Sequence, residues 1–185
     1  MSHQVGMPAD EALRLLEEGN ERYLSDNYSA DYSSKRRLET AENGQHPYAV
    51  ILTCSDSRVI PELIFSSGIG DLFVIRAAGN VVDNCTADSL IYAVEHLGCR
   101  LVVVLGHTVC GAVREALHYS GDHPLDTINL IRAAIGGETD PFQASVLNVR
   151  NSVKSINQLF DEKDVKIVGA MYDIRTGVVD FDILS

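Results

Sequence analysis

Leu101-Val-Val-Val-Leu105 is followed without a break by Gly106-His-Thr-Val-Cys-Gly-Ala112. A run of apolar, largely β-branched residues predicts a strand that is covered on both faces, as the strands of parallel sheets are. Two similar runs lie upstream, at Tyr48 to Thr53 and at Leu72 to Arg76. Each run is followed by polar residues or glycine, so the three together favour a mainly parallel central sheet.

Helical patterns separate and follow these runs. Apolar residues recur at three-to-four spacing in Cys85 to Leu97, and again in Gly111 to Tyr119 and Phe142 to Phe160. This alternation predicts an α/β fold, a mainly parallel sheet flanked by helices. Lys166 to Tyr172 and Val178 to Leu184 flank a turn-like segment. We therefore expect an antiparallel pair at the sheet edge near the C-terminus.

The first 44 residues differ from the rest. Pro8 to Asn27 carries apolar residues at three-to-four spacing among Glu and Arg, which predicts an amphipathic helix. Tyr28 to Gly44 is more polar and predicts a second helical stretch with loops. That stretch forms either an arm that packs on a partner subunit or a helix folded on its own domain. We expect one domain over residues 1–185, with residues 1–44 as an N-terminal helical arm and 45–185 as the α/β core.

Composition narrows the classes of function. The chain has 185 residues and a formal net charge of −11, with 45% hydrophobic and 22% charged residues. An acidic surface repels phosphate backbones and anionic headgroups, which argues against nucleic-acid or membrane partners. No apolar run approaches the ~20 residues of a membrane span, and the first residues lack the pattern of a secretory signal. We therefore expect a cytoplasmic protein.

Two strand ends carry the most reactive side chains. Cys54 directly follows the first strand, and His107 and Cys110 follow the third. Ligands gather at the carboxyl ends of parallel strands, so we expect these three residues to meet. If a helix begins near His107, the three-residue spacing places His107 and Cys110 on one face. Two thiolates and one imidazole suit Zn²⁺ with a fourth position open to water, which is a catalytic pattern.

Each cysteine taken alone has a simpler interpretation. Buried cysteines are common and usually inert, so Cys54 or Cys110 by itself would be expected to fill a core. Cys85 and Cys99 lie in or at the end of an apolar helical pattern, where the core interpretation holds. His96 is expected on the flank of a helix. Four further histidines are expected at the surface: His3, His46, His118 and His123.

Asp56 and Arg58 lie just after Cys54, two residues apart. An Asp beside an Arg is held ionised and oriented by charge-assisted hydrogen bonds. The Asp56 carboxylate could accept a hydrogen bond from water on the metal, or it could ligate the metal itself and close the site. A plain ion pair that holds the loop is the third alternative.

The two motifs, Cys54-Ser-Asp-Ser-Arg58 and His107-x-x-Cys110, resemble those of the β-class carbonic anhydrases. The resemblance covers residues from about 45 to 112. It implies that the two cysteines and the histidine ligate one Zn²⁺ per subunit. It also implies that the Asp-Arg pair decides whether the fourth position holds water or Asp56.

The same resemblance implies a substrate pocket shared between subunits. It places Gln45, Phe73 and Tyr92 in that pocket as residues of the partner subunit, and Gly111 beside the last ligand. It further implies a homo-oligomer, either a dimer or a tetramer of dimers. The first helix, Pro8 to Asn27, resembles the arm that family members wrap around a neighbour.

The activity that the resemblance implies is reversible hydration of CO₂ to bicarbonate and a proton, by attack of zinc-bound hydroxide. Such an enzyme is a lyase, a carbonate dehydratase. Two alternatives stay open: a hydrolase of carbonyl sulfide or carbon disulfide on the same scaffold, and a non-catalytic zinc protein that serves as an interaction module. Nucleotide binding is a weaker hypothesis, because no glycine-rich phosphate loop follows a strand.

Overall fold

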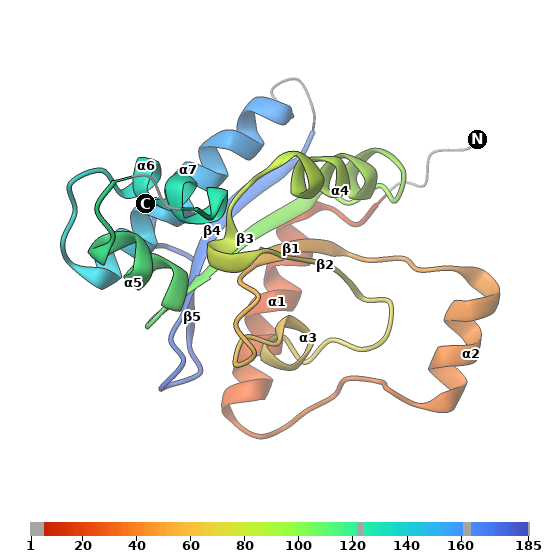
Figure 1. Cartoon of the computed structure of the whole chain (residues 1–185). Helices are drawn as coiled ribbons and strands as arrows, with labels where there is room; N and C mark the ends of the chain where they lie inside the picture. Colours follow the sequence, from red (N-terminus) through yellow and green to blue (C-terminus); the bar gives the residue numbers. More distant parts are fainter. Residues whose placement is uncertain (1–5, 122–123, 161–163, 185) are drawn as a thin grey trace.

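A five-stranded sheet lies at the centre of the computed structural model, which describes residues 6–121, 124–160 and 164–184 (Figure 1). Its order is β2-β1-β3-β4-β5. Strands β1 to β4 pair in parallel, and β5 pairs antiparallel with β4. The predicted mainly parallel sheet with an antiparallel edge is therefore confirmed. The strand bounds are β1 Ala49–Thr53, β2 Leu72–Arg76, β3 Leu101–His107, β4 Lys166–Tyr172 and β5 Val179–Asp180.

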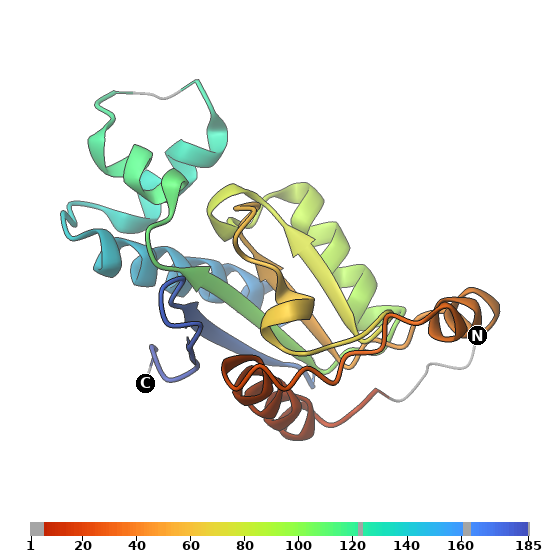
Figure 2. The ribbon, with the colours of Figure 1, turned by 90° about the horizontal axis from the view of Figure 1, so that it is seen from below.

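Helices cover both faces of the sheet, because alternate strand residues point to opposite sides. Val103 and Leu105 pack in one cluster with residues of α1 and α3, whereas Val102 and Val104 pack in another with residues of α4 and α7. Figure 2 shows the sheet lying between α1 and these two helices. The helix bounds are α1 Ala9–Leu24, α2 Ser34–Asn43, α3 Pro61–Ile64, α4 Asn84–Glu95, α5 Gly111–His118, α6 Asp126–Ile135 and α7 Pro141–Leu159.

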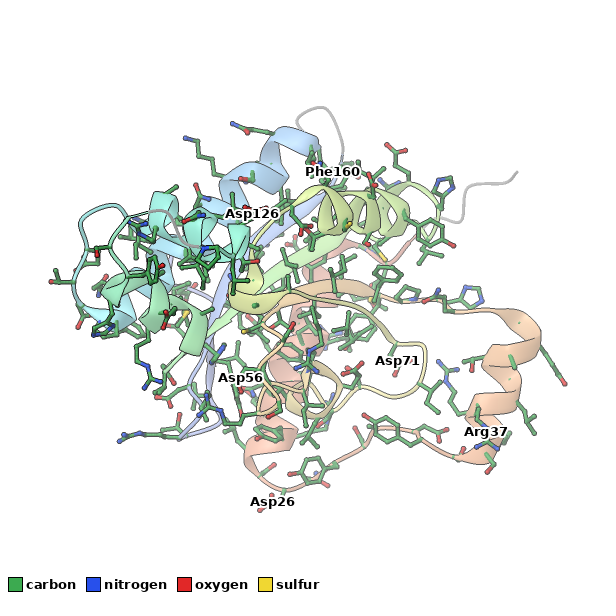
Figure 3. The ribbon with its side chains drawn as sticks, viewed as in Figure 1. Asp26, Arg37, Asp56, Asp71, Asp126 and Phe160 are labelled. Carbon is green, nitrogen blue, oxygen red and sulfur yellow. The ribbon has the colours of Figure 1, made fainter. Side chains whose placement is uncertain are left out.

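The N-terminal region divides into two parts. Helix α1 packs on the sheet of the same chain, where Ala12 and Leu16 are fully buried. Helix α2 buries no residue and stands away from the core. It is tethered by Arg36, which forms an ion pair of 2.9 Å with Asp71 on the side of the core that faces α2 (Figure 3). The first helix thus contributes to the core of its own chain, and a contact of either helix with a partner stays a prediction.

Asn20 joins α1 to α3 and to the edge of the sheet at β5. Its buried amide donates to the carbonyls of Ile64 and Gly177 at 3.3 and 2.9 Å, and its carbonyl accepts from the Val179 amide at 3.0 Å. Replacing Asn20 with alanine leaves those backbone groups buried without partners, so the free energy of unfolding should fall by about 2 to 4 kcal/mol. Urea unfolding measures this change.

Asn157→Ala is the matched control for that measurement. The Asn157 amide is exposed and, in the described part of the chain, donates within α7 to the carbonyl of Val153. Its loss should change the free energy of unfolding by no more than about 0.5 kcal/mol. If Asn20→Ala changed stability as little as Asn157→Ala, the α1 anchor would be wrong.

The loops that follow β1 and β3 leave the sheet in opposite directions. The chain passes from β1 to β2 through α3 on one face, and from β3 to β4 through α5, α6 and α7, of which α7 packs on the other face. β1 and β3 are neighbours in the sheet. This divergence creates a crevice at their carboxyl ends, the usual place for a ligand site in an open α/β sheet.

Two strands differ in length from those predicted, and one helix was not predicted. β3 continues past Leu105 to His107, because Gly106 lies inside the strand: a Cβ there would come within 2.4 Å of Val149 on α7. The glycine marks close packing rather than the end of the strand. The last strand is only two residues long, shorter than Val178 to Leu184. Helix α6 was not predicted. In the part of the chain that the structure describes, no helix is long and apolar enough to cross a membrane.

Candidate metal centre

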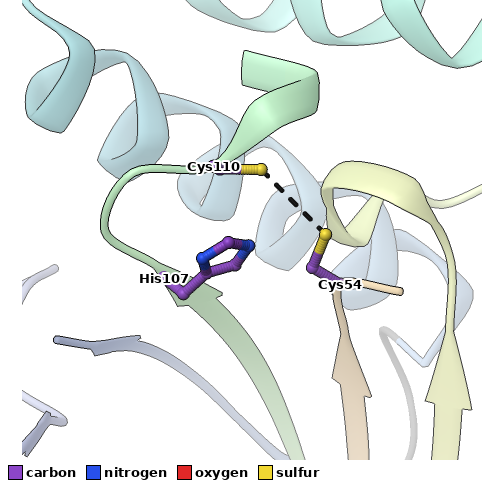
Figure 4. A group of neighbouring side chains, drawn as sticks. All are labelled: Cys54, His107 and Cys110. Atoms are coloured by element: carbon purple, nitrogen blue, oxygen red, sulfur yellow. Dashed lines mark hydrogen bonds between the residues drawn. The ribbon is translucent and has the colours of Figure 1, made fainter. Parts of the chain in front are cut away.

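Cys54, His107 and Cys110 come together at the crevice between β1 and β3 (Figure 4). Each offers one ligand atom, and these atoms lie within 4.8 Å of one another. The two sulfur atoms are 4.0 Å apart, and all three side chains are buried. Two thiolates on one tetrahedral zinc, each at about 2.3 Å, would lie about 3.8 Å apart. The separation in the structure is close to that value.

The His107 ring is oriented by its neighbour. Its Nδ1 lies 2.9 Å from the carbonyl oxygen of Thr108, which can only accept, so Nδ1 carries the proton. Nε2 then has a free lone pair, and it is buried with no hydrogen-bond partner among the described residues. A buried, unpartnered acceptor beside two thiols fits a metal ligand, since metal-bound histidines commonly donate their other nitrogen to a carbonyl.

The reason that His107 and Cys110 meet is not the predicted one. His107 is the last residue of β3, and Cys110 precedes the first residue of α5. A two-residue turn brings them together, and a shared helix face does not. Within that turn Val109 adopts φ of 58°, a left-handed conformation that is unfavourable for a β-branched residue. Strain of this kind persists where the surrounding structure fixes the backbone.

Cys54 and Cys110 share a hydrogen bond between their sulfur atoms, and it shifts their pKa values in opposite directions. The hydrogen bond with the Cys110 thiol is the largest influence that lowers the pKa of Cys54, to about 4, and the Gly79 amide acts in the same direction. The pKa of Cys110 is raised well above its ordinary value, because this thiol donates to Cys54 and is buried. A bound divalent cation would compensate charge on both sulfurs.

Asp56 does not join this cluster but pairs with Arg58. Its Oδ1 accepts from the Arg58 amide and Nε at 3.0 and 2.9 Å, and its Oδ2 accepts from the guanidinium at 2.6 Å. These hydrogen bonds hold the pKa of the Asp56 carboxyl well below its usual range. Asp56 is therefore ionised at neutral pH and oriented by Arg58.

Two arginines fix the loop after β1. Arg76, the last residue of β2, donates to the carbonyls of Cys54 and Asp56 at 3.3 and 2.7 Å. Arg58 reaches across to the Val109 carbonyl at 3.4 Å. The loops that carry the two cysteines are thus joined to each other. The sequence analysis did not identify Arg76, whose only signal is its place at a strand end beside the first ligand.

The predicted pocket residues do not converge on this cluster within one chain. Phe73 lies near the start of β2 with its ring 6.2 Å from that of Tyr92. It pairs with Val50, four residues before Cys54, which corresponds to about 13 Å along the strand. Gln45 is exposed before the start of β1. A Cβ at Gly111 would meet no atom within 4 Å, so packing within the chain does not require glycine there.

The remaining cysteines and histidines behave differently from one another. Cys99 is buried as predicted, and burial raises the pKa of its thiol to about 11. The prediction for Cys85 is wrong: it lies in the first turn of α4 and is exposed. The predicted surface positions are confirmed for His46 and His118, while His3 and His123 lie outside the described residues. His96, predicted on the flank of a helix, is exposed at the C-cap of α4.

Comparison with known proteins agrees with this geometry. A family model described as carbonic anhydrase matches residues 49–179. A carbonic anhydrase of Mycobacterium tuberculosis is 45% identical over 114 residues, which are 62% of this chain and 55% of that protein. One from Synechococcus elongatus is 33% identical over 90% of this chain and 70% of its own length. The match thus spans little more than half of the mycobacterial relative.

Solved structures give the same result. A β-carbonic anhydrase of Aspergillus fumigatus has a TM-score of 0.70 at 27% identity, with 95% of this chain and 91% of that chain covered. A carbon disulfide hydrolase has a TM-score of 0.59 at 21% identity over 79% of this chain and 86% of its own, which shows a common fold. With the family model covering most of the chain and a Cys-His-Cys cluster at the strand ends, the chain belongs to the β-carbonic anhydrase family.

Proposed function

We propose that this chain binds one Zn²⁺ through Cys54, His107 and Cys110 and catalyses the reversible hydration of CO₂ to bicarbonate. The observation that carries the proposal is the buried, unpartnered Nε2 of His107 beside two sulfur atoms. Membership in the family supports the choice of reaction. The donor set supports the choice of metal, because two thiolates and an imidazole suit zinc better than hard cations.

Zinc, when bound, lowers the pKa of a coordinated water toward about 7 and so makes a nucleophile available at neutral pH. The protein supplies the setting for that chemistry. Cys54, His107 and Cys110 would hold the metal through three donor atoms, from the ends of β1 and β3 and the start of α5, and would leave it accessible to water. Their burial keeps bulk water away from the sulfurs.

Asp56 orients the reacting water in this proposal. Its Oδ2 accepts one hydrogen bond from Arg58, which leaves a lone pair to accept a hydrogen bond from water. Because Arg58 keeps the Asp56 carboxylate ionised, the carboxylate accepts hydrogen bonds and does not donate them. It therefore selects the water orientation in which an oxygen lone pair, rather than a hydrogen, faces the CO₂ carbon.

Stopped-flow CO₂ hydration on purified protein, with zinc content determined on the same sample, tests the proposal. We expect about one zinc per chain and turnover that rises from pH 7 to 9 as water on the metal loses its proton. Zinc-bound protein that releases sulfide from carbonyl sulfide and leaves CO₂ unchanged would instead be a hydrolase of the sulfur compounds. Zinc without either reaction would identify a non-catalytic zinc protein.

We further propose that the active form is a homo-oligomer in which Gln45, Phe73 and Tyr92 complete the site of the partner subunit. Phe73, with Tyr92 beside it, lies toward the opposite end of the strands from the metal ligands, and Gln45 precedes β1. Tyr92 is also exposed, although it is large and aromatic. In a twofold dimer, residues on one face of each subunit can meet the crevice of the other subunit, so both sites are completed in the same way.

Mixed dimers test this sharing of residues. Co-expression of Gln45→Ala and Cys54→Ser chains with different affinity tags allows the mixed dimer to be purified. If Gln45 serves the partner's site, the mixed dimer has one intact site of two and about half of the wild-type activity. Each variant alone should be far less active. A mixed dimer no more active than Gln45→Ala alone would show that Gln45 does not act across an interface.

A further inference from the structure

Helix α7 contacts the short turn that follows β2 through two buried polar side chains. The Asn148 amide donates to the carbonyl of Gly79 at 2.6 Å, and the Ser152 hydroxyl donates to the carbonyl of Asn80 at 3.0 Å. Asn148 and Ser152 are one helical turn apart, and each is 2% exposed. Both therefore face the same segment, the 3₁₀ turn Ala78–Asn80.

That turn points a backbone amide at one sulfur of the cluster. The Gly79 N–H donates to Cys54 Sγ at 3.2 Å. Gly79 has φ of 65°, and a Cβ there would come within 2.5 Å of Ile131 on α6. The turn is thus packed between α6, α7 and the sulfur atom, and its left-handed backbone conformation favours glycine.

These contacts differ from the usual behaviour of polar residues in a helix. Serine in a helix commonly donates to a carbonyl of its own preceding turn, as Ser145 does to Pro141 and Ser155 does to Asn151. Ser152 instead donates to a segment that is 72 residues away in the sequence. Asn148 does the same across 69 residues.

We propose that Asn148 and Ser152 are positioning residues that hold the Gly79 amide on the Cys54 sulfur and thereby control how tightly this sulfur retains a metal. The inference rests on the metal site of the proposed function, though not on CO₂ as its substrate. By fixing the two peptide groups that follow the Gly79 amide, the pair limits rotation of that amide away from the sulfur. A fixed N–H donor withdraws electron density from a thiolate and holds its lone pairs in place for the metal.

Co²⁺ in place of zinc makes the sulfur environment visible. A thiolate–cobalt charge-transfer band lies at lower energy when the sulfur is more electron-rich, so loss of the N–H donor should shift this band to longer wavelength. Asn148→Ala and Asn148→Ala/Ser152→Ala should show that shift. They should also release zinc to a chelator about 10- to 100-fold faster than wild type, the usual effect of removing an outer hydrogen bond.

Ser145→Ala is the matched control. Ser145 is a buried serine of the same helix whose hydroxyl, among the described residues, donates within α7 to Pro141, so its loss should move neither the band nor the release rate. Urea unfolding of the metal-free proteins accounts for stability differences. If the double variant does not fold, Ser152→Ala, which loses one hydroxyl, should still shift the band in the same direction.

A wild-type band and release rate in Asn148→Ala and Ser152→Ala would overturn the inference, whatever their stability. CO₂ hydration distinguishes this failure from failure of the proposed function. Wild-type protein that shows the cobalt band but no hydration would contradict the proposed reaction and leave the positioning role to be decided by the variants. Wild-type protein without a sulfur–cobalt band would contradict the metal site and this inference together.

Discussion

Replacing Cys54 with serine is expected to remove bound zinc and abolish CO₂ hydration. Serine is nearly isosteric with cysteine, but its hydroxyl is not ionised at neutral pH, so His107 and Cys110 remain as the two protein ligands. We expect zinc content to fall from about one per chain to near zero and kcat/KM to fall by about 1,000-fold or more. Metal analysis and stopped-flow hydration on the same sample measure both.

Cys85 provides the control for this experiment. It is a free cysteine that is exposed on α4, so Cys85→Ser makes the same chemical change away from the cluster. Zinc content and turnover should equal those of wild type. Both serine variants should unfold at similar denaturant concentrations when metal is absent, whereas added zinc should stabilise Cys85→Ser alone. Full zinc occupancy and turnover in Cys54→Ser would remove Cys54 from the site.

The meeting of the three cluster residues was predictable because it depends on topology. Cys54 directly follows one buried strand and His107 ends another, and the carboxyl ends of neighbouring parallel strands must lie side by side. The local geometry was not predictable in the same way. Gly106 looks like the end of a strand in the sequence, and only the packing of Val149 against it shows why the strand continues to His107.

The groups that support the ligands were hidden for a related reason. Asn148 is 69 residues from Gly79, and a polar residue in an amphipathic helix has no sequence signal that identifies a distant carbonyl as its partner. Exposure of Cys85 was missed because a cysteine among apolar neighbours resembles core, although it lies in the first turn of α4 and points outward. Periodicity identifies the buried face of a helix best in its middle, where several turns agree.

Replacing Asp56 with asparagine should reduce turnover while zinc stays bound. Asparagine keeps the size of the side chain but loses the charge, and it accepts hydrogen bonds at one oxygen instead of two. Arg58 then has no carboxylate to hold, and the water beside the metal is no longer oriented. We expect kcat to fall about 10- to 100-fold with zinc content unchanged. Asp10→Asn, which breaks the exposed ion pair with Lys166, is the control and should keep wild-type turnover.

The contribution of the Asp56–Arg58 pair to the free energy of unfolding should decrease at acid pH. The folded pKa of Asp56 is lowered, chiefly by its hydrogen bonds with Arg58, relative to about 3.9 in an unfolded chain. Its stabilising effect is therefore fully present above the unfolded pKa and is lost as the pH falls through the lower folded pKa. The stability difference between wild type and Asp56→Asn should be constant from pH 9 to 6 and shrink below about pH 4.

The pH dependence of activity distinguishes the two catalytic roles considered for Asp56, which are orienting the water and ligating the metal. If the carboxylate stays on Arg58, as its hydrogen bonds indicate, it does not titrate between pH 6 and 9, and water on the metal alone sets the pH profile. The ratio of wild-type to Asp56→Asn turnover should then be the same throughout that range. If Asp56 instead left Arg58 to ligate the metal at lower pH, wild type would lose activity there and Asp56→Asn would not, so the ratio would fall. A falling ratio would therefore assign Asp56 to closing the site, whereas a constant ratio assigns it to orienting the water.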